Sequence, residues 1–359
     1  MQKKILLLLP DLSAGGAERI NLDLAYEFKR IGFNVEIVLK MSKGVLLLDA
    51  LKDFDVINLN VTSDIKFIFK LSSYINRSKP DAIIASMWGL TAFTAFSKLI
   101  NRNKFKLLLI EHSSLVSQFK NASFKTRFWL KVSTFLAYRI ADEVAGVSSG
   151  VCSDMKRVSH LNKLPTTLYN PIPLFNIEDS STPAIKYPST TIIAAGRLID
   201  AKDYPTLLRA ISIVNEELDV TLIILGEGPL RAQLQSMVND YNLEKAVHFK
   251  GFVNTPREYF ANADLFVLSS KREGFGNVIV EALGCGTPVV ATDCNYGPSE
   301  ILSDGKFGKL VPVGDEKKLA DAIICSLASE HEQNKLIERA KYFAPDVVVK
   351  RYLDVLGFN

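Results

Sequence analysis

Short apolar runs alternate with amphipathic stretches along nearly the whole chain, and this alternation constrains the fold more than any other feature. Six runs in the first half predict strands, at residues 4–9, 35–39, 56–59, 82–85, 106–110 and 144–147. Six runs in the second half do the same, at residues 191–195, 220–225, 247–249, 265–268, 288–291 and 308–311. Strands that alternate with helices form parallel sheets covered by those helices. The sequence therefore predicts an α/β protein made of two similar layered units.

Chain length supports the division into two domains. The 359 residues exceed the roughly 250 to 300 at which a single hydrophobic core stops growing. Four prolines, at 171, 173, 183 and 188, lie in a segment without clear periodicity. We expect an N-terminal domain over residues 1–170, a linker over 171–190 and a C-terminal domain over 191–335. Residues 336–359 are expected to be helical, with a break near Pro345, and to pack back on the first domain.

Composition narrows the cellular setting. The apolar run after the two N-terminal lysines ends at Pro10, too short for a signal peptide, and no apolar stretch approaches the roughly 18 residues of a spanning helix. The four cysteines show neither CxxC pairs nor zinc-like spacing, which favours a reducing cytoplasm. Residues 1–170 contain 24 Lys and Arg against 14 Asp and Glu, whereas the rest of the chain is net acidic. The two halves are therefore expected to meet different partners.

The segment from Glu273 to Glu281 carries the most chemical information. It follows a predicted strand, its glycines at 274 and 276 permit a tight turn, and Asn277 opens a helix. Backbone amides at that helix start can bind a diphosphate. Glu281 lies one turn further on, where its carboxylate can accept two hydrogen bonds from a ribose diol, and Glu273 can bind sugar hydroxyls. Either glutamate alone also fits an ordinary solvated charge.

A second loop offers positive charge. Arg197 and Lys202 lie between the first strand of the second domain and the next helix, where they can converge on phosphate oxygens. Because residues 191–335 contain no DxD motif to hold a divalent metal beside this loop, we expect these cations to stabilise a departing nucleotide without a metal or another cofactor. Considered alone, the two residues also fit surface charges. Gly226-Glu-Gly-Pro229 is interpreted mainly as a turn before a helix.

In the first domain, Gly15 and Gly16 follow the first strand and permit close backbone approach to a phosphate or sugar. This loop is not GxGxxG, which removes the main support for a nicotinamide-dependent oxidoreductase. His112 ends another predicted strand and can face a cleft, where it would hydrogen-bond a hexose or an acceptor. A purely structural histidine fits equally well.

In combination, these motifs resemble those of the family 4 glycosyltransferases, whose GT-B fold consists of two facing Rossmann-like domains. The matching residues span nearly the whole chain; they are Gly15, Gly16, His112, Gly196, Arg197, Lys202, Gly226-Glu-Gly-Pro229, Glu273 and Glu281. The resemblance implies a retaining enzyme without a required metal, in which the leaving phosphate helps to deprotonate the acceptor.

The resemblance also implies individual roles. Arg197 and Lys202 would bind the donor diphosphate, and Glu281 the ribose. Glu273 and the backbone of three residues would hold the hexose and distal phosphate; those three are Phe275, Gly276 and Asn277. His112 would contact the transferred sugar, and the backbone around Val253 would contact the base.

The expected donor is a hexose or N-acetylhexosamine on a nucleotide diphosphate. UDP is favoured because the chain resembles bacterial enzymes that build capsule, O-antigen or protein-linked glycans on lipid carriers. The acceptor would be an oligosaccharide or a lipid-linked glycan. A sugar-nucleotide epimerase or a phosphorylase of the same architecture, and a non-catalytic assembly partner, are alternatives. A phosphorylase would need a much longer chain.

Residues 102–139 contain eight basic residues and one acid, with aromatic residues at nearly helical spacing among them. This segment can rest on anionic lipid headgroups at the inner face of the cytoplasmic membrane, or it can be a helix that covers the first sheet and shows its lysines to water. No nucleic-acid-binding motif is present, so a nucleic-acid partner is not expected.

Overall fold

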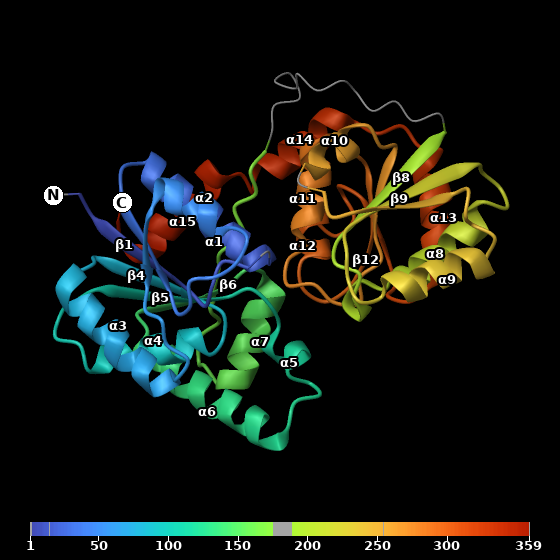
Figure 1. Ribbon diagram of the computed structural model, residues 1–359. Coiled ribbons are helices and arrows are strands. Elements are labelled where there is room, and N and C mark those ends of the chain that lie inside the picture. Colours follow the sequence, from blue (N-terminus) through green and yellow to red (C-terminus); the bar gives the residue numbers. More distant parts are fainter. Residues whose placement is uncertain (1, 14, 175–188, 254, 359) are drawn as a thin grey trace. The chain divides into compact units, whose positions relative to one another are not determined.

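The computed structural model describes residues 2–13, 15–174, 189–253 and 255–358, and the chain divides into two compact units (Figure 1). Unit 1 comprises Met1–Ile172 and Pro345–Asn359, and unit 2 comprises Pro173–Ala344. Each unit is a parallel sheet covered by helices, so the predicted α/β class is confirmed.

The domain limits differ from the prediction at the C-terminal end. The segment 336–359 does not belong to one domain, because its first part lies in unit 2 and the chain returns to unit 1 only at Pro345. Most of the predicted linker, residues 175–188, lies outside the described residues. Of the described linker residues, those up to Ile172 belong to unit 1 and those from Pro173 onward belong to unit 2. Thr190, the last residue of the predicted linker, is already the first residue of β8.

In the described part of unit 1, seven parallel strands form a sheet in the order β3-β2-β1-β4-β5-β6-β7. The strands are β1 (Lys4–Leu9), β2 (Asn34–Leu39), β3 (Asp55–Asn58), β4 (Ala82–Ser86), β5 (Lys106–Glu111), β6 (Glu143–Gly146) and β7 (Thr166–Thr167). β1 and β4 are buried over nearly their whole length, as expected for central strands covered on both faces. β7 was not predicted, because two residues carry no readable periodicity.

Helices cover both faces of this sheet (Figure 1). They are α1 (Gly16–Arg30), α2 (Leu47–Asp53), α3 (Asp64–Ser78), α4 (Leu90–Leu99), α5 (Leu115–Gln118), α6 (Phe124–Ile140), α7 (Ser149–Ser159) and α15 (Pro345–Leu356). α4 packs between α3 and α6, whereas α15 packs against α1. There the Phe28 and Tyr352 rings meet edge to face, with centroids 6.3 Å apart. The last helix of the chain thus completes the core of unit 1.

In the described part of unit 2, six parallel strands form a sheet in the order β10-β9-β8-β11-β12-β13. They are β8 (Thr190–Ala195), β9 (Val220–Leu225), β10 (Val247–Gly251), β11 (Leu265–Leu268), β12 (Val289–Thr292) and β13 (Lys309–Val311). All six had been predicted within two residues at each end.

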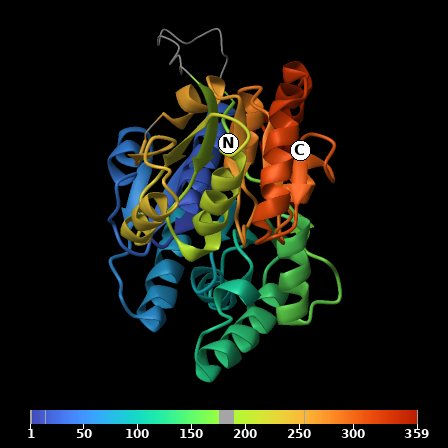
Figure 2. The ribbon, with the colours of Figure 1, turned by 90° about the vertical axis from the view of Figure 1, so that its right-hand side faces the viewer.

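The helices of unit 2 also lie on both faces of their sheet (Figures 1 and 2). They are η2 (Asp200–Lys202), α8 (Tyr204–Val214), α9 (Arg231–Asp240), α10 (Pro256–Ala261), α11 (Asn277–Gly284), α12 (Pro298–Leu302), α13 (Glu316–Leu327) and α14 (Gln333–Lys341). α8 packs against both α9 and α13, and these helices share one buried apolar cluster with the central strands. α11 packs against α10 and α14. No helix in the described parts of the chain is long and apolar enough to cross a membrane.

Both sheets have the doubly wound strand order, and ligands in such sheets bind outside the carboxyl ends of strands where that order reverses. In unit 1 the reversal lies between β1 and β4, and in unit 2 between β8 and β11. The loop after β8 contains Arg197 and Lys202, and the loop after β11 contains Glu273. Topology therefore brings two loops together that are about 70 positions apart in the sequence.

Candidate functional site

The two loops at the strand reversal of unit 2 are joined by an ion pair. Lys202 Nζ donates a hydrogen bond of 2.6 Å to Glu273 Oε1, and the two side chains are only 18 % and 10 % exposed. Ser270 donates a second hydrogen bond of 2.6 Å to the same oxygen. Oε2 of Glu273 accepts no hydrogen bond from the residues that the structure describes. The carboxylate is therefore fixed through one oxygen, and the other is available to a ligand.

Further contacts make the two loops one platform. The Lys271 ammonium lies 2.9 Å from Asp200 Oδ1, a contact that lowers the pKa of Asp200 and raises that of Lys271. The Lys271 backbone amide donates to the carbonyl of Ala201 at 2.8 Å. Ser269 Oγ donates to the carbonyl of Lys202 at 2.8 Å. These bonds fix the backbone from which Lys202 and Glu273 extend.

Arg197 differs from Lys202 because its guanidinium is not held in an ion pair by any residue that the structure describes. Its side chain is exposed, and within the described residues it takes part in no hydrogen bond or ion pair. The backbone beside it is ordered, because the Leu198 amide donates to the carbonyl of Glu227 at 2.9 Å. A guanidinium presented from a fixed loop can bind phosphate oxygens bidentately.

Gly226 and Gly228 allow a third loop to pack on the first. A Cβ at Gly226, where φ is +135°, would lie 2.0 Å from the carbonyl oxygen of Gly196, and a Cβ at Gly228 would lie 2.5 Å from that of Leu198. The sequence predicts this segment mainly as a turn, and it also counts among the residues that carry the family resemblance. Its glycines also set the position of the backbone around Arg197.

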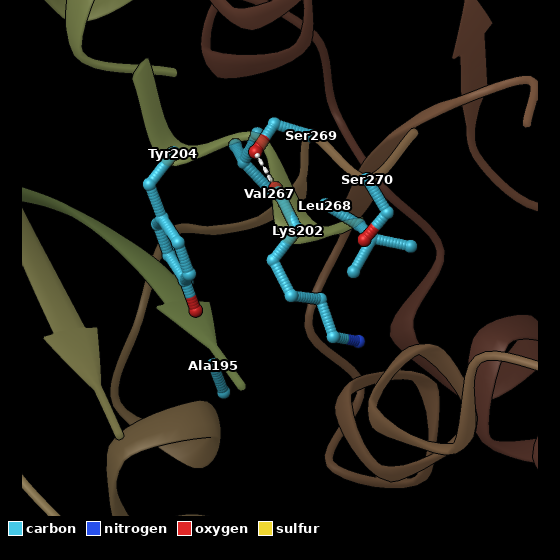
Figure 3. A pocket seen from close by; sticks show the side chains of 8 residues that line it. Ala195, Lys202, Tyr204, Val267, Leu268, Ser269 and Ser270 are labelled. Carbon is cyan, nitrogen blue, oxygen red and sulfur yellow. Dashed lines mark hydrogen bonds between the residues drawn. The ribbon is translucent and has the colours of Figure 1, made fainter. Parts of the chain in front are cut away.

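A small pocket lies beneath this platform (Figure 3). Figure 3 shows the Lys202 side chain extending between Tyr204 and Ser270, with the hydrogen bond from Ser269 to its backbone. The pocket leaves no interior space that even a water molecule could occupy. A sugar nucleotide does not fit inside it.

The turn after Glu273 has the geometry that its glycines suggested. Gly276 has a φ of +103° and caps α11, which begins at Asn277 as predicted. Phe275 is buried, and its ring lies 5.4 Å from that of Phe343. Glu281 is partly exposed one turn into α11. The same short segment thus presents the Glu273 carboxylate, the helix start and Glu281.

Two neighbours of this turn were not assigned to the site from the sequence. A Cβ at Gly297 would lie 1.6 Å from the carbonyl oxygen of Phe275, so the loop after β12 packs directly on the turn. Cys294 in the same loop is buried, and burial together with the charge of Glu273 raises its pKa to about 12. Its thiol is therefore protonated beside the carboxylate. Both residues follow β12, which neighbours β11 in the sheet, so a predicted strand order of β8-β11-β12 would have placed Cys294 and Gly297 beside the site.

Val253 follows β10 and is partly exposed. Residue 254 lies outside the described residues, so the predicted contact between this backbone and a base stays a prediction.

In unit 1, Gly15 precedes α1 and Gly16 is its first residue. The Glu18 carboxylate lies over this turn, since a Cβ at Gly15 would be 2.1 Å from Glu18 Oε2. A carboxylate repels phosphate and accepts hydrogen bonds from hydroxyl groups. The predicted approach of a phosphate or sugar to Gly15 and Gly16 stays a prediction.

His112 follows β5 and belongs to a polar cluster with Asn21 and Ser86. Its Nε2 lies 3.3 Å from Asn21 Nδ2 and 3.4 Å from Ser86 Oγ. Ser86 donates to Asn21 Oδ1 at 2.9 Å, and Asn21 Nδ2 also donates to the carbonyl of Ala17. This pattern assigns Nε2 as an acceptor and the ring proton to Nδ1.

Burial lowers the pKa of His112 to about 4, against a smaller opposing effect of Asn170. The imidazole is therefore neutral at pH 7. A sugar hydroxyl that bound Nε2 would have to displace the amide of Asn21, so the predicted sugar contact of His112 stays a prediction.

Apart from Val253, which follows β10, the predicted donor residues of unit 2 thus lie on two adjoining loops and the helix that follows them. Gly15, Gly16 and His112 belong to unit 1, which the structure describes separately. Among the described residues, no group of three or more His, Cys, Asp or Glu could hold a metal ion.

Comparison with known proteins identifies the family. Residues 14–174 match the model of "Glycosyltransferase Family 4", and residues 177–343 match that of "Glycosyl transferases group 1". A relative from Campylobacter jejuni is 31% identical over 289 residues, which cover 79% of this chain and 73% of the relative. The chain belongs to glycosyltransferase family 4. The Campylobacter protein is named N-acetylgalactosamine-N,N'-diacetylbacillosaminyl-diphospho-undecaprenol 4-alpha-N-acetylgalactosaminyltransferase.

Solved structures agree on the fold of this glycosyltransferase. Anabaena HepE in complex with UDP and glucose superposes with a TM-score of 0.79 at 22% identity, over 99% of this chain and 100% of that one. The lipopolysaccharide outer core galactosyltransferase WaaB has a TM-score of 0.79 at 17% identity, over 99% of both chains. The predicted GT-B fold is confirmed.

Proposed function

We propose that this glycosyltransferase moves a hexose or N-acetylhexosamine from a nucleotide diphosphate, with UDP favoured, to a glycan or lipid-linked acceptor. The transfer would serve bacterial polysaccharide or glycan synthesis and would retain the anomeric configuration of the donor sugar. The reaction would take place on the cytoplasmic side of the membrane. The observation that carries the proposal is the platform of unit 2, where Lys202 is paired with Glu273 beside the exposed Arg197.

The relatives support this substrate class. The Campylobacter enzyme is named as acting on a diphospho-undecaprenol-linked glycan, and the HepE structure contains UDP and glucose. A relative from Staphylococcus aureus, 27% identical over 72% of this chain, is named poly(ribitol-phosphate) alpha-N-acetylglucosaminyltransferase.

In the proposed reaction, the bond between the anomeric carbon and the phosphate oxygen breaks, and negative charge develops on the leaving diphosphate. Arg197 and Lys202 stabilise that charge from a loop whose backbone is already ordered, so little reorganisation is needed during the reaction. The acceptor oxygen forms the new bond on the face that the diphosphate leaves. The acceptor proton passes to the leaving phosphate oxygen.

Glu273 has two functions in this scheme. Oε1 holds the Lys202 ammonium, and Oε2 accepts a hydrogen bond from a sugar hydroxyl. Glu281 accepts hydrogen bonds from the ribose. The backbone of the turn between Phe275 and Asn277 binds the distal phosphate at the start of α11.

Nucleotide identity is tested by thermal unfolding of the full chain with UDP, GDP and their sugars. A ligand that binds only the folded state raises the melting temperature, and the shift grows with the logarithm of the ligand concentration divided by its dissociation constant. Stabilisation by UDP-sugars is expected; stabilisation by GDP-sugars alone would contradict the choice of UDP.

Turnover of the Lys202→Met variant tests the role of the platform. Loss of one group that stabilises a developing oxyanion costs about 10²–10³ in kcat. The matched control is Lys317→Met, which removes an exposed lysine on α13. Equal kcat for Lys202→Met and the wild type would refute the platform.

The anomeric configuration of the product, determined by NMR, tests retention. An α-linked product from an α-linked donor is expected, and a β-linked product would contradict it. Conversion of the donor without any acceptor would instead identify an epimerase.

A further inference from the structure

Helix α6 has two chemically distinct faces. The inward face is made of residues that pack on unit 1; they are Leu130, Ser133, Thr134, Ala137 and Tyr138. Ser133 accepts a hydrogen bond from Trp88 Nε1 at 3.1 Å, and Tyr138 donates one to Glu111 at 3.0 Å. The inward face alone therefore accounts for the packing of α6 on the rest of unit 1.

The outward face of α6 is apolar where a surface helix is normally polar. Phe124 is 84 % exposed, Phe128 58 % and Trp129 50 %, and Phe135 and Leu136 are also exposed. Phe124, Phe128 and Phe135 are separated by four and seven residues, which places their rings on one side of the helix. Packing within unit 1 does not explain these aromatic residues, because none of them lies on the inward face.

Charge on and before α6 has one sign. Residues 112–141 contain five Lys and Arg and no Asp or Glu. Four of the five are exposed and form no ion pair with any described residue; they are Lys120, Lys125, Arg127 and Lys131. Arg139 differs, because its guanidinium donates to the carbonyls of Phe135, Ser159 and His160. Four cations are thus available to an external partner.

We propose that the outward face of α6, together with Lys120, docks on an anionic lipid bilayer. Amphipathic helices with basic residues beside aromatic ones lie in the headgroup region, where the rings enter the acyl boundary and the cations meet anionic headgroups. The uniform positive charge fits a surface of anionic headgroups. This proposal goes beyond the sugar-transfer reaction, and its test uses no turnover.

Cosedimentation of the full chain with vesicles tests the docking. Binding is expected to vesicles of phosphatidylglycerol and phosphatidylcholine, and much less to phosphatidylcholine alone. Each basic residue near an anionic surface contributes on the order of a fivefold preference, so Lys125→Glu with Lys131→Glu should weaken binding at least roughly 30-fold. The matched control is Lys245→Glu with Lys317→Glu, which changes net charge equally on exposed residues of unit 2.

Apolar insertion is tested separately with Phe128→Glu. The control is Leu218→Glu, an exposed apolar residue of unit 2. Loss of vesicle binding in Phe128→Glu but not in Leu218→Glu supports insertion. Equal binding of both variants and the wild type would overturn the proposal.

Tryptophan fluorescence locates the contact, because the chain has only two tryptophans. Trp88 packs edge to face on Phe119 with a centroid distance of 4.6 Å, whereas Trp129 lies on the outward face. Vesicles should shift the wild-type emission to the blue, and brominated lipids should quench it. The same changes in Trp129→Phe would place the contact elsewhere and overturn the proposal.

The outward face of α6 could instead bind a second copy of this chain. Sedimentation equilibrium without lipid distinguishes such self-association from lipid binding. A monomeric wild type supports a lipid partner. An oligomer that Phe128→Glu dissociates would mean that the face is a protein interface, which overturns the proposal.

Discussion

The Lys202–Glu273 pair allows a quantitative test of the platform in the absence of substrate. The perturbations are Lys202→Met, Glu273→Gln and the double variant. Each single change leaves one charge without its partner at a site where the side chains are 18 % and 10 % exposed. Breaking a fully buried pair costs about 3–5 kcal/mol, and exposed pairs contribute about 0–1 kcal/mol.

The partial exposure places each single substitution between these limits, at about 2 kcal/mol of unfolding free energy. Unit 2 spans residues 173–344, and for a domain of that size about 1 kcal/mol lowers the melting temperature by roughly 2–4 °C. Each single variant should therefore melt roughly 4–8 °C below the wild type. The double variant removes both charges and should melt no lower than either single variant.

The assay is calorimetry. The transition of unit 2 is taken as the one that a nucleotide shifts in the wild type, because the proposed function places the nucleotide on that unit. Since each single variant loses about 2 kcal/mol and the double variant loses no more than either, the interaction free energy of the cycle is expected at about 2 kcal/mol or more. It should persist at high salt, because little-exposed charges are screened weakly. Strictly additive single and double effects would refute the reasoning, since they would mean that the two groups do not interact in the free enzyme.

Two further predictions concern backbone packing and pH. Gly297→Ala places a Cβ 1.6 Å from the carbonyl oxygen of Phe275 at a φ of +118°, and it should lower the unfolding free energy by about 4 kcal/mol or more. The control is Gly314→Ala, where φ is +76° and nothing lies within 4 Å of the added Cβ, and it should cost only about 1 kcal/mol. Equal urea midpoints for the two variants would contradict this prediction. Burial raises the pKa of Glu111 from 4.5 to about 7, so the folded state binds a proton that the unfolded state has lost, and stability should fall as pH rises from about 4.5 to about 7. Glu111→Gln removes this dependence and should be more stable than the wild type at pH 8 by up to about 3 kcal/mol; parallel urea midpoints for the two proteins from pH 5 to 8 would show that Glu111 does not titrate in this way.

The strand pattern was enough to predict the α/β class and two layered units, because a buried parallel strand needs a continuous apolar run, whereas the GT-B fold was implied by the resemblance of the motifs to family 4 glycosyltransferases. The strand pattern failed where the apolar signal is absent or ambiguous. β7 has only two residues, and the helical pattern after residue 335 continues across two units. The chain crosses between those units just before Pro345, and the proline was interpreted only as a break in the helix.

The chemical residues of unit 2 were predicted as donor ligands, and their mutual contact was not. Lys202 and Glu273 were both expected to face the substrate, yet in the structure they bind one another. Sequence spacing carries no information about this pairing, because it depends on β8 and β11 being neighbours in the sheet.

The pairing changes how the cationic site should be understood. A lysine already held by a carboxylate contributes less net charge to an incoming diphosphate than a free one, so the exposed Arg197 would supply the larger part of the initial attraction. As charge develops on the leaving group, the ammonium can redistribute its hydrogen bonds from Glu273 toward the phosphate, while Ser270 continues to hold the carboxylate. A lysine arranged in this way would favour the transition state over the bound donor, which is the difference on which the reaction rate depends.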